Sequence, residues 1–380
     1  MLNAFRISIV MAILAILVVA SILVYSYINR SSIAKEAENY IAVEDFAGRV
    51  VKVPRDVRRI VALGPGMLRL ISYLNSLDLV VGTEEVEHTW TTPGRDYAMA
   101  YGELFRGLPI VGTGGPRNPP DPEKIRIAKP DLVVMFLGYT ALYDPDRLSE
   151  EVGAPVIAVD YSPAGYVELE PVKKALRLLG KVLGREARAE EICKFIDSVV
   201  SDLTLRVKDI DSKPIVYVGA VSYAGKRPFT ASQAGFPPLL LLNTNSIADE
   251  VSQKHGFVEL DFEYLLQKQP DVIFIDLNNL DVVLDDFAKD KVKYCSLKAF
   301  RDGKVYSILP FNYYHTNIAT ALADTYYIGK VLYPEKFTDI DPVAKADEIF
   351  MAFLGKGLYE EFVKGFGRGF GQLGDLFNCG

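Results

Sequence analysis

Histidine and cysteine are scarce in this chain of 380 residues, and their scarcity narrows the chemistry that it can carry. A site for a bare transition-metal ion needs several histidine or carboxylate ligands that converge. The three histidines are widely spaced, so we predict no metal site and no cofactor of the protein's own. The three cysteines show no metal-binding spacing and no disulfide framework; at most one bridge can form, and we expect buried or terminal free thiols instead. These residues are His88, His255, His315, Cys193, Cys295 and Cys379.

Catalytic motifs are also missing. The sequence contains no Gly-x-Ser-x-Gly, no Walker A loop and no His-Glu-x-x-His pattern. The turn 112–115 (Gly-Thr-Gly-Gly) follows an expected strand, as a phosphate-binding loop does. Prolines follow it instead of a helix, so we interpret it as a cleft loop. We therefore predict no catalytic residue and no enzyme.

Positive charge is not concentrated anywhere. The net charge is −7 and the chain has no basic block. We predict no nucleic-acid partner, because such proteins carry basic patches that neutralise phosphates. Tryptophan occurs once, but there are 21 tyrosines and 20 phenylalanines. Tyrosine-rich surfaces suit ligand contacts, since the rigid ring carries a polar tip.

One long hydrophobic run is present, at the N-terminus. Ile7 to Ile28 comprises 22 residues without a charge. As a helix it spans about 33 Å, enough for a hydrocarbon core of about 30 Å. Two interpretations stay open: an uncleaved anchor that holds an extracytoplasmic protein on the cell membrane, or a long signal peptide cut near Ala20 or later, which leaves the protein periplasmic. We assign residues 1–36 to this segment and its tether.

A twelve-residue pattern occurs twice. Residues 123–134 and 263–274 both begin with Glu, reach Pro-Asp seven residues later and end in a β-branched, apolar run. The proline ends a short helix, because its ring disfavours helical geometry in the preceding residue. The run after the aspartate is typical of a buried parallel strand. The copies start 140 positions apart, which is too far for a solenoid and fits two similar lobes that form a cleft.

Short apolar runs alternate with helical patterns in both halves, which predicts βαβ units and parallel sheets. A charged helical stretch lies between the halves and is nearly 40 Å long at about 1.5 Å per residue. We predict an α/β fold of two Rossmann-like lobes with central parallel sheets, joined by a single long rigid α-helix, with a ligand cleft between the lobes. The predicted domains are 37–184, the N-terminal lobe; 185–210, the linking helix; 211–338, the C-terminal lobe; and 339–380, a C-terminal helix and a glycine-rich tail without fixed structure.

The expected elements follow from these patterns. A hairpin is expected over 43–53. The expected strands are Ile60–Leu63, Asp78–Gly82, Leu108–Val111, Leu132–Leu137, Ala154–Asp160, Ile215–Val218, Val272–Ile275 and Val305–Ile308. The expected helices include Val167–Leu183, Arg185–Ile210, Thr316–Leu332 and one that starts at Asp341-Pro342, an N-cap followed by proline.

Several motifs match a known family in order and spacing. They are Asp45-Phe46-Ala47-Gly48-Arg49-Val50-Val51-Lys52-Val53-Pro54, Arg59-Ile60-Val61-Ala62-Leu63-Gly64-Pro65, Val80-Val81-Gly82 and the two Glu…Pro-Asp units. Over roughly residues 43–335 the chain resembles the substrate-binding proteins of ABC importers for iron–siderophore complexes and cobalamin, the class with a helical backbone. The resemblance implies two lobes on one long helix, a small-molecule metal chelate between them, and an ABC permease with its ATPase as partners. We expect a monomer.

The resemblance also implies a role for Glu123 and Glu263. One lies at the outer tip of each lobe, and both are expected to dock onto arginines of the permease. Two carboxylates on a rigid body pair well with arginine forks and set orientation. The alternative is that both are ordinary first-turn acids, favoured by the helix dipole.

Ligand contacts are expected from loops at the carboxyl ends of the strands. Gly64 and Gly66 open a helix and Arg69 lies one turn in, so bare amides and a cation predict an anion site. Many family members carry an acid at the position of Arg69, and the departure indicates an anionic ligand. The alternative is an arginine that lies along the surface.

Aromatic and arginine residues follow the other strand ends. Rings with arginine suit a planar, anionic chelate through stacking and cation–π contact. His315 has two further interpretations, a ligand to the chelated iron and a simply packed side chain. The predicted ligand contacts are Gly64, Gly66, Arg69, Trp90, Arg95 and Tyr139 in the first lobe, and Tyr223, Arg227, Tyr313, Tyr314 and His315 in the second.

Three functional hypotheses follow. The first is an extracytoplasmic, membrane-tethered receptor that captures an iron(III)-siderophore, cobalamin, haem or a similar chelate, closes modestly around its stiff helix and delivers its cargo to an ABC importer. The second is an anchored enzyme that acts on an anionic metabolite in the cleft, which a perturbed titratable cluster would favour. The third is an ectodomain that senses the ligand without transport.

Overall fold

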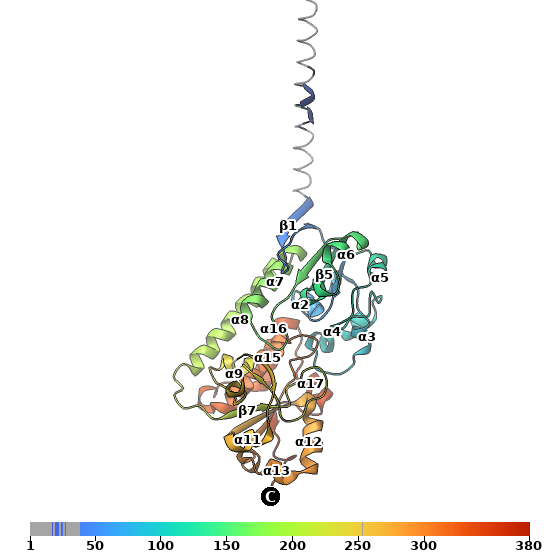
Figure 1. Ribbon diagram of the computed structural model, residues 1–380. Helices are drawn as coiled ribbons and strands as arrows, with labels where there is room; N and C mark the ends of the chain where they lie inside the picture. The colour runs from blue at the N-terminus through green and yellow to red at the C-terminus, as the bar shows by residue number, and fades with distance from the viewer. Residues whose placement is uncertain (1–16, 18–19, 23, 26, 28–38, 253) are drawn as a thin grey trace, which may run out of the picture.

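The computed structural model describes residues 17, 20–22, 24–25, 27, 39–252 and 254–380 (Figure 1). The run Ile7–Ile28 and its tether lie almost entirely outside these residues, so both interpretations of this segment stay predictions. Among the described residues, no helix has both the length and the apolar character that a membrane crossing requires. The described chain forms two α/β lobes along one long helix, which confirms the predicted fold class.

The first lobe is built on a parallel sheet in the order β4-β3-β5-β6. Its strands are almost completely buried because helices cover both faces. Ile60 and Ala62 face one apolar core and Val61 and Leu63 the other, as the alternation along a strand requires. The strands are β3 (Ile60–Leu63), β4 (Val80–Gly82), β5 (Leu132–Phe136) and β6 (Val156–Val159), preceded by the hairpin of β1 (Tyr40–Glu44) and β2 (Val50–Pro54).

The helices of this lobe occupy the connections between the strands. The α-helices are α2 (Met67–Tyr73), α3 (Val86–Thr89), α4 (Asp96–Arg106), α5 (Pro122–Ala128), α6 (Pro145–Val152) and α7 (Leu169–Leu183), with 3-10 turns η1 (Leu77–Leu79) and η2 (Leu137–Ala141). One predicted strand is wrong: Leu108–Val111 forms only an isolated bridge between Thr83 and Ile110. Pro109 interrupts that segment and has no N–H for a ladder.

The linking helix α8 (Glu186–Val207) has 22 residues and is therefore about 33 Å long. It packs against α7 of the first lobe and against α9 of the second. Buried residues recur along one face of it, among them Ile192, Ile196, Val199 and Leu203. A continuous apolar face of this kind makes α8 a strut that both lobes share.

The second lobe repeats the scheme with a sheet in the order β12-β11-β10-β7. β7, β10 and β11 are parallel and β12 is antiparallel to β11. The strands are β7 (Val216–Gly219), β10 (Val272–Asp276), β11 (Val305–Ile308) and β12 (Gly371–Gln372), with a separate antiparallel pair β8 (Ala231–Ala234) and β9 (Gly256–Glu259). The helices are α9 (Pro237–Leu241), α10 (Ala248–Val251), α11 (Phe262–Lys268), α12 (Leu280–Lys289), α13 (Lys291–Cys295), α14 (Lys298–Arg301), α15 (Ile318–Leu332), α16 (Pro342–Leu354) and α17 (Tyr359–Phe366), with η3 (Leu277–Asn279) and η4 (Pro334–Lys336).

Both copies of the Glu…Pro-Asp pattern adopt one structure. α5 and α11 each begin after an aspartate and end at a left-handed residue, Lys129 (φ 48°) or Gln269 (φ 47°). The aspartate of each Pro-Asp pair, Asp131 or Asp271, then accepts a backbone N–H at the start of a neighbouring strand, at 2.9 Å and 3.0 Å respectively. The repeat in the sequence is therefore a repeat in space.

The C-terminal segment braces the two lobes. α16 packs on α15 of the second lobe and on α2 of the first (Figure 1). The rings of Tyr73 and Phe353 lie 4.8 Å apart, and Lys356 Nζ donates to the carbonyl of Ala100 at 2.6 Å. α8 is thus the covalent link between the lobes, but not the only element that spans them.

The tail after Gly365 is ordered, so the prediction of a tail without fixed structure is wrong. β12 extends the second sheet, and Leu373 and Phe377 are buried. Cys295 and Cys379 form a disulfide across 84 residues, which corrects the expectation of free thiols. A disulfide of this kind is typical of proteins outside the cytoplasm.

Loss of this bridge should destabilise the second lobe. We expect Cys295→Ser to lower the free energy of unfolding by about 2–4 kcal/mol, because the bridge restricts a long loop of the unfolded chain. Urea unfolding with and without reductant measures the effect, and Cys193→Ser, at a buried free thiol, is the control. An unfolding curve that reductant leaves unchanged in the unmodified protein would contradict the pairing.

Candidate ligand-binding cleft

A cavity of about 790 Å³ opens between the two lobes. Much of its wall consists of loops that follow β3, β6, β7, β10 and β11 at their carboxyl ends, and the segment after α3, residues 116–117 and Phe257 of β9 complete it. Parallel strands bring these ends to one edge of each sheet, and the two edges face each other across the cavity. The cleft therefore lies where the strand assignments place it.

Five aromatic rings line the cavity: Trp90, Tyr223, Phe257, Tyr313 and Tyr314. Trp90 meets Tyr314 edge-on, with ring centroids 5.2 Å apart. On the second lobe Tyr223 stacks on Phe257 at 4.0 Å, with an angle of 18° between the planes. Rings in stacked and edge-on pairs form a rigid apolar surface that suits a planar or aromatic ligand. Four of the five were predicted from the sequence; Phe257 was not.

The charge in the cavity is positive. Its lining contains Arg117 and Lys226 and no aspartate or glutamate. Arg117 is exposed and makes no hydrogen bond or ion pair with any other described residue. Lys226 Nζ lies 2.8 Å from Asp281, a carboxylate outside the lining, so its charge is partly neutralised. Neither cation was predicted from the sequence, although Arg117 lies two residues after the turn interpreted as a cleft loop.

Arg69 does not line the cavity. Its side chain is 0% exposed and binds Asp96 at 2.7 Å, and its guanidinium lies over the ring of Tyr97, 4.9 Å from the centroid. A second bond, also of 2.7 Å, runs to the hydroxyl of Tyr161. The prediction that Arg69 offers a free cation to the ligand is therefore corrected, and so is the alternative of a surface arginine.

The predicted anion site at Gly64 and Gly66 is also corrected. The N–H of Gly64 already donates to Glu84 Oε2 at 2.7 Å. Both glycines have positive φ, 88° and 80°. A Cβ at Gly66 would lie 2.5 Å from the hydroxyl of Tyr161. These glycines allow close packing beneath the cleft, and the amide of Gly64 is not available to an anion.

Three further predicted contacts lie outside the lining. Arg95 is buried and binds the carboxylate of Glu87 at 2.6 Å. Tyr139 is also buried, and its hydroxyl donates to a carbonyl of the cleft loop at 2.6 Å. Arg227 lies over the ring of Tyr223, 5.6 Å from its centroid. All three support side chains or loops that line the cavity.

His315 lines the cavity, but both of its ring nitrogens are engaged. Nδ1 accepts the N–H of Thr316 at 2.9 Å, and Nε2 lies 3.3 Å from Asp160. Burial lowers its pKa, which favours the neutral ring. This arrangement does not favour His315 as an iron ligand. Among the described residues, no three histidine, cysteine, aspartate or glutamate side chains converge on a possible metal position.

Glu84 is a buried carboxyl at the base of the cleft that was not predicted from the sequence. Besides the N–H of Gly64 it faces the hydroxyls of Tyr139 and Tyr314, at 3.3 Å and 3.2 Å. Burial raises its pKa to about 7, although these donors favour the charged form. The only local signal for it in the sequence is its position just after a strand end.

The raised pKa predicts a pH-dependent stability. The folded protein holds the proton of Glu84 more tightly than the unfolded chain does. The protonated carboxyl therefore contributes fully to the free energy of unfolding below pH 4.5, and this contribution is lost as the pH rises through about 7. Between pH 4.5 and 7.5, the unfolding free energy of the unmodified protein should fall by roughly 3 kcal/mol more than that of Glu84→Gln. Urea unfolding at several pH values measures it. Asp276 and Asp324 also have raised pKa values. They titrate in the unmodified protein and in the variant alike, so their effects cancel in the comparison. Parallel pH profiles would contradict the assignment.

Two α/β lobes with a cleft between their strand-end loops define a two-lobed ligand-binding protein. A family model described as periplasmic binding protein matches residues 60–310. The chain therefore belongs to the periplasmic binding protein family, whose members are the substrate-binding proteins of ABC transporters. The resemblance drawn from the sequence is confirmed at this level, and it makes the protein a transport component that acts outside the cytoplasm with a permease and a small-molecule ligand.

Solved structures share the fold. The TroA-like periplasmic binding protein FepB from Veillonella parvula is 24% identical, with a TM-score of 0.65 over 83% of this chain and 97% of that one. The Haemophilus influenzae protein MolA, bound to molybdate, is 19% identical, with a TM-score of 0.62 over 83% and 98%. Helicobacter pylori CeuE with Ni(II) bound is 16% identical, with a TM-score of 0.57 over 83% and 96%. A search of curated proteins found no match.

Proposed function

We propose that this substrate-binding protein captures an anionic metal chelate, with an iron(III)-siderophore as the first candidate. The lining of the cleft carries the proposal: five aromatic rings and two cations, with no carboxylate. Aromatic faces stack on planar groups and attract delocalised systems, and the cations offset a net negative charge. A carboxylate-free lining gives a bare metal cation no hard oxygen ligand of negative charge.

The size of the cavity supports a chelate over a small ion. Its volume of about 790 Å³ falls within the range of pockets for drug-sized ligands, about 300–1,000 Å³. A bare oxyanion or metal ion would fill a small fraction of this space and would leave most of the aromatic surface in water. The cargo is therefore proposed to be an organic complex, with the metal inside it.

We also propose that Glu123 and Glu263 dock the protein on its permease. Both are exposed, both follow an aspartate by two positions at the start of matching helices, and neither forms an ion pair with another described residue. α5 and α11 lie on different lobes and well apart (Figure 1). Two separated, unpaired carboxylates suit contact with two arginine sites and define one orientation. The N-terminal run is proposed to tether a monomer to the membrane.

Fluorescence of Trp90 tests the ligand class. It is the only tryptophan, and it lines the cavity. The full chain in detergent is titrated with ferric siderophores, cobalamin, haem, ferric ion and molybdate, with free tryptophan as the inner-filter control. We expect saturable quenching by a ferric siderophore and none by the bare ions. Saturation by a bare ion alone would overturn the proposal, and saturation by cobalamin or haem would change the chelate.

A further inference from the structure

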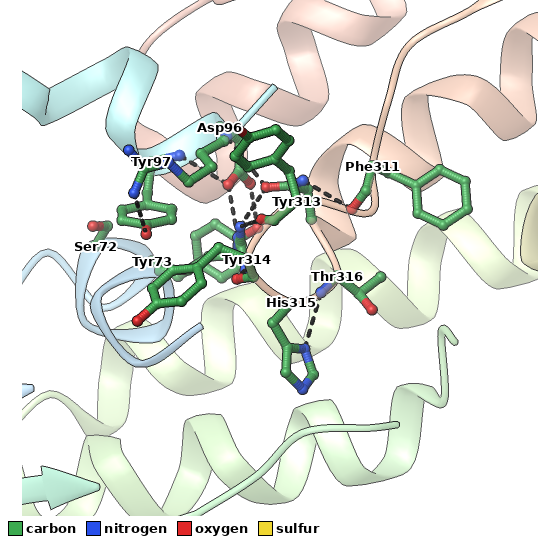
Figure 2. Close-up of polar contacts among 12 residues, drawn as sticks. Ser72, Tyr73, Asp96, Tyr97, Phe311, Tyr313, Tyr314, His315 and Thr316 are labelled. Carbon is green, nitrogen blue, oxygen red and sulfur yellow. Dashed lines mark hydrogen bonds and ion pairs between the residues drawn. The ribbon is translucent and has the colours of Figure 1, made fainter. Parts of the chain in front are cut away.

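The segment 312–317 belongs to the second lobe by sequence but binds the first lobe. It connects β11 to α15. Figure 2 shows Tyr313 of this segment close to Asp96 of the first lobe, whose backbone N–H donates to Asn317 Oδ1 at 3.2 Å. The hydroxyl of Tyr161 donates to the carbonyl of Thr316 at 3.0 Å. The amide of Asn317 donates to the carbonyl of a first-lobe loop at 2.9 Å. The segment is thus fixed to the lobe across the cleft.

Arg69 makes the largest share of these contacts. Its guanidinium has five N–H donors, and all five have acceptors. Two bind the first-lobe groups described above. The other three bind the segment: 3.1 Å to the carbonyl of Tyr313, 3.3 Å to the carbonyl of Tyr314 and 2.5 Å to Asn317 Oδ1. No other side chain among the described residues makes three hydrogen bonds to this segment.

The backbone of the segment needs such support. Tyr314 and His315 have φ angles of 52° and 75°, in the left-handed region. Residues with a Cβ adopt this region singly and at a cost, and two in succession are rarer. Such a conformation persists only where the surroundings hold it. The same two residues line the cavity, so the conformation decides which rings face the ligand.

We propose that Arg69 is a positioning residue that builds the cleft before the ligand arrives. It fixes the carbonyls of Tyr313 and Tyr314 to the first lobe, and their side chains then form the aromatic wall beside Trp90. A wall that is already ordered removes a cost of binding. Only the identity of the cavity as the ligand site rests on the proposed function, because the clamp itself is a property of the ligand-free protein.

Hydrogen exchange of the ligand-free protein tests the clamp. Peptides that cover 309–318 should be protected in the unmodified chain. In Arg69→Lys, which keeps the charge and loses the fork, we expect these amides to exchange about tenfold faster or more. The emission of Trp90 should shift to longer wavelength, because its contacts with Tyr313 and Tyr314 loosen. Asn317→Ala removes the acceptor on the segment itself and should reproduce both changes.

Arg49→Ala is the matched control. Arg49 forms an ion pair and donates to a backbone carbonyl inside the first lobe, far from the segment in all its described contacts. Its loss should lower global stability and leave the exchange of 309–318 and the emission of Trp90 at their original values. Unprotected amides in the unmodified protein would overturn the proposal, even if both variants fail to fold. Unchanged exchange in Arg69→Lys and Asn317→Ala would overturn it as well, whatever ligand is found to bind.

Discussion

Arg117→Ala combined with Lys226→Ala should weaken binding of an anionic ferric chelate about 100-fold, since each charge-assisted hydrogen bond contributes roughly 1.5 kcal/mol. These are the cations of the cavity lining, and no lining carboxylate offsets them. Arg117 should account for more of the loss, because Lys226 is shared with Asp281. Quenching of Trp90 gives the dissociation constants, and the affinity of the unmodified protein should fall as ionic strength rises.

The control removes the same charge elsewhere. Arg58 and Lys268 are partly or largely exposed and pair with carboxylates away from the cavity. The double variant Arg58→Ala with Lys268→Ala has the same net charge as the cleft variant and should bind normally. An equal loss of affinity in the two double variants would show that the overall charge of the protein acts on the ligand. It would contradict the proposal that Arg117 and Lys226 bind the ligand.

Charge reversal at the two proposed docking acids, Glu123→Arg with Glu263→Arg, should abolish uptake and leave ligand affinity unchanged. In the proposed docking, each reversal replaces an attraction to a permease arginine by a repulsion, at a cost of several kcal/mol. We therefore expect transport to fall about 100-fold or more in cells or vesicles that contain the permease and its ATPase. Single variants should fall between the double variant and the unmodified protein.

Glu103→Arg with Glu360→Arg is the control for this experiment. Both glutamates are exposed, one on each lobe, and neither forms an ion pair with another described residue. Their reversal changes the net charge by the same amount as the reversal of Glu123 and Glu263, but Glu103 and Glu360 lie outside the repeated helix starts. Retained uptake by the Glu123 and Glu263 variant would leave these residues as ordinary first-turn acids.

Local patterns in the sequence were enough for most of the fold. The repeated Glu…Pro-Asp units identified two lobes, because a proline, a left-handed turn and a buried strand are determined by neighbouring residues. The positions of Trp90, Tyr223, Tyr313 and Tyr314 followed from the strand ends, since parallel strands present their carboxyl ends along one edge. These inferences needed no knowledge of distant partners.

The features that were not predicted depend on contacts between residues far apart in the sequence. Arg69 has its carboxylate partner 27 residues away and its backbone acceptors 244 and 245 residues away, so nothing near it indicates burial. Cys295 and Cys379 pair only because the tail folds back along β11. Arg117 was overlooked because a single arginine in a proline-rich loop has no pattern of its own; only its position in the cavity lining distinguishes it.

The contact between α16 and α2 also determines when the first lobe can finish folding. α2 is buried along its whole length, and α16, which comes more than 260 residues later, supplies part of its cover. The first lobe therefore keeps an apolar face uncovered until almost the whole chain has been synthesised. Contacts at such a separation form slowly. The core of the first lobe is therefore completed late, by a segment from the far end of the chain.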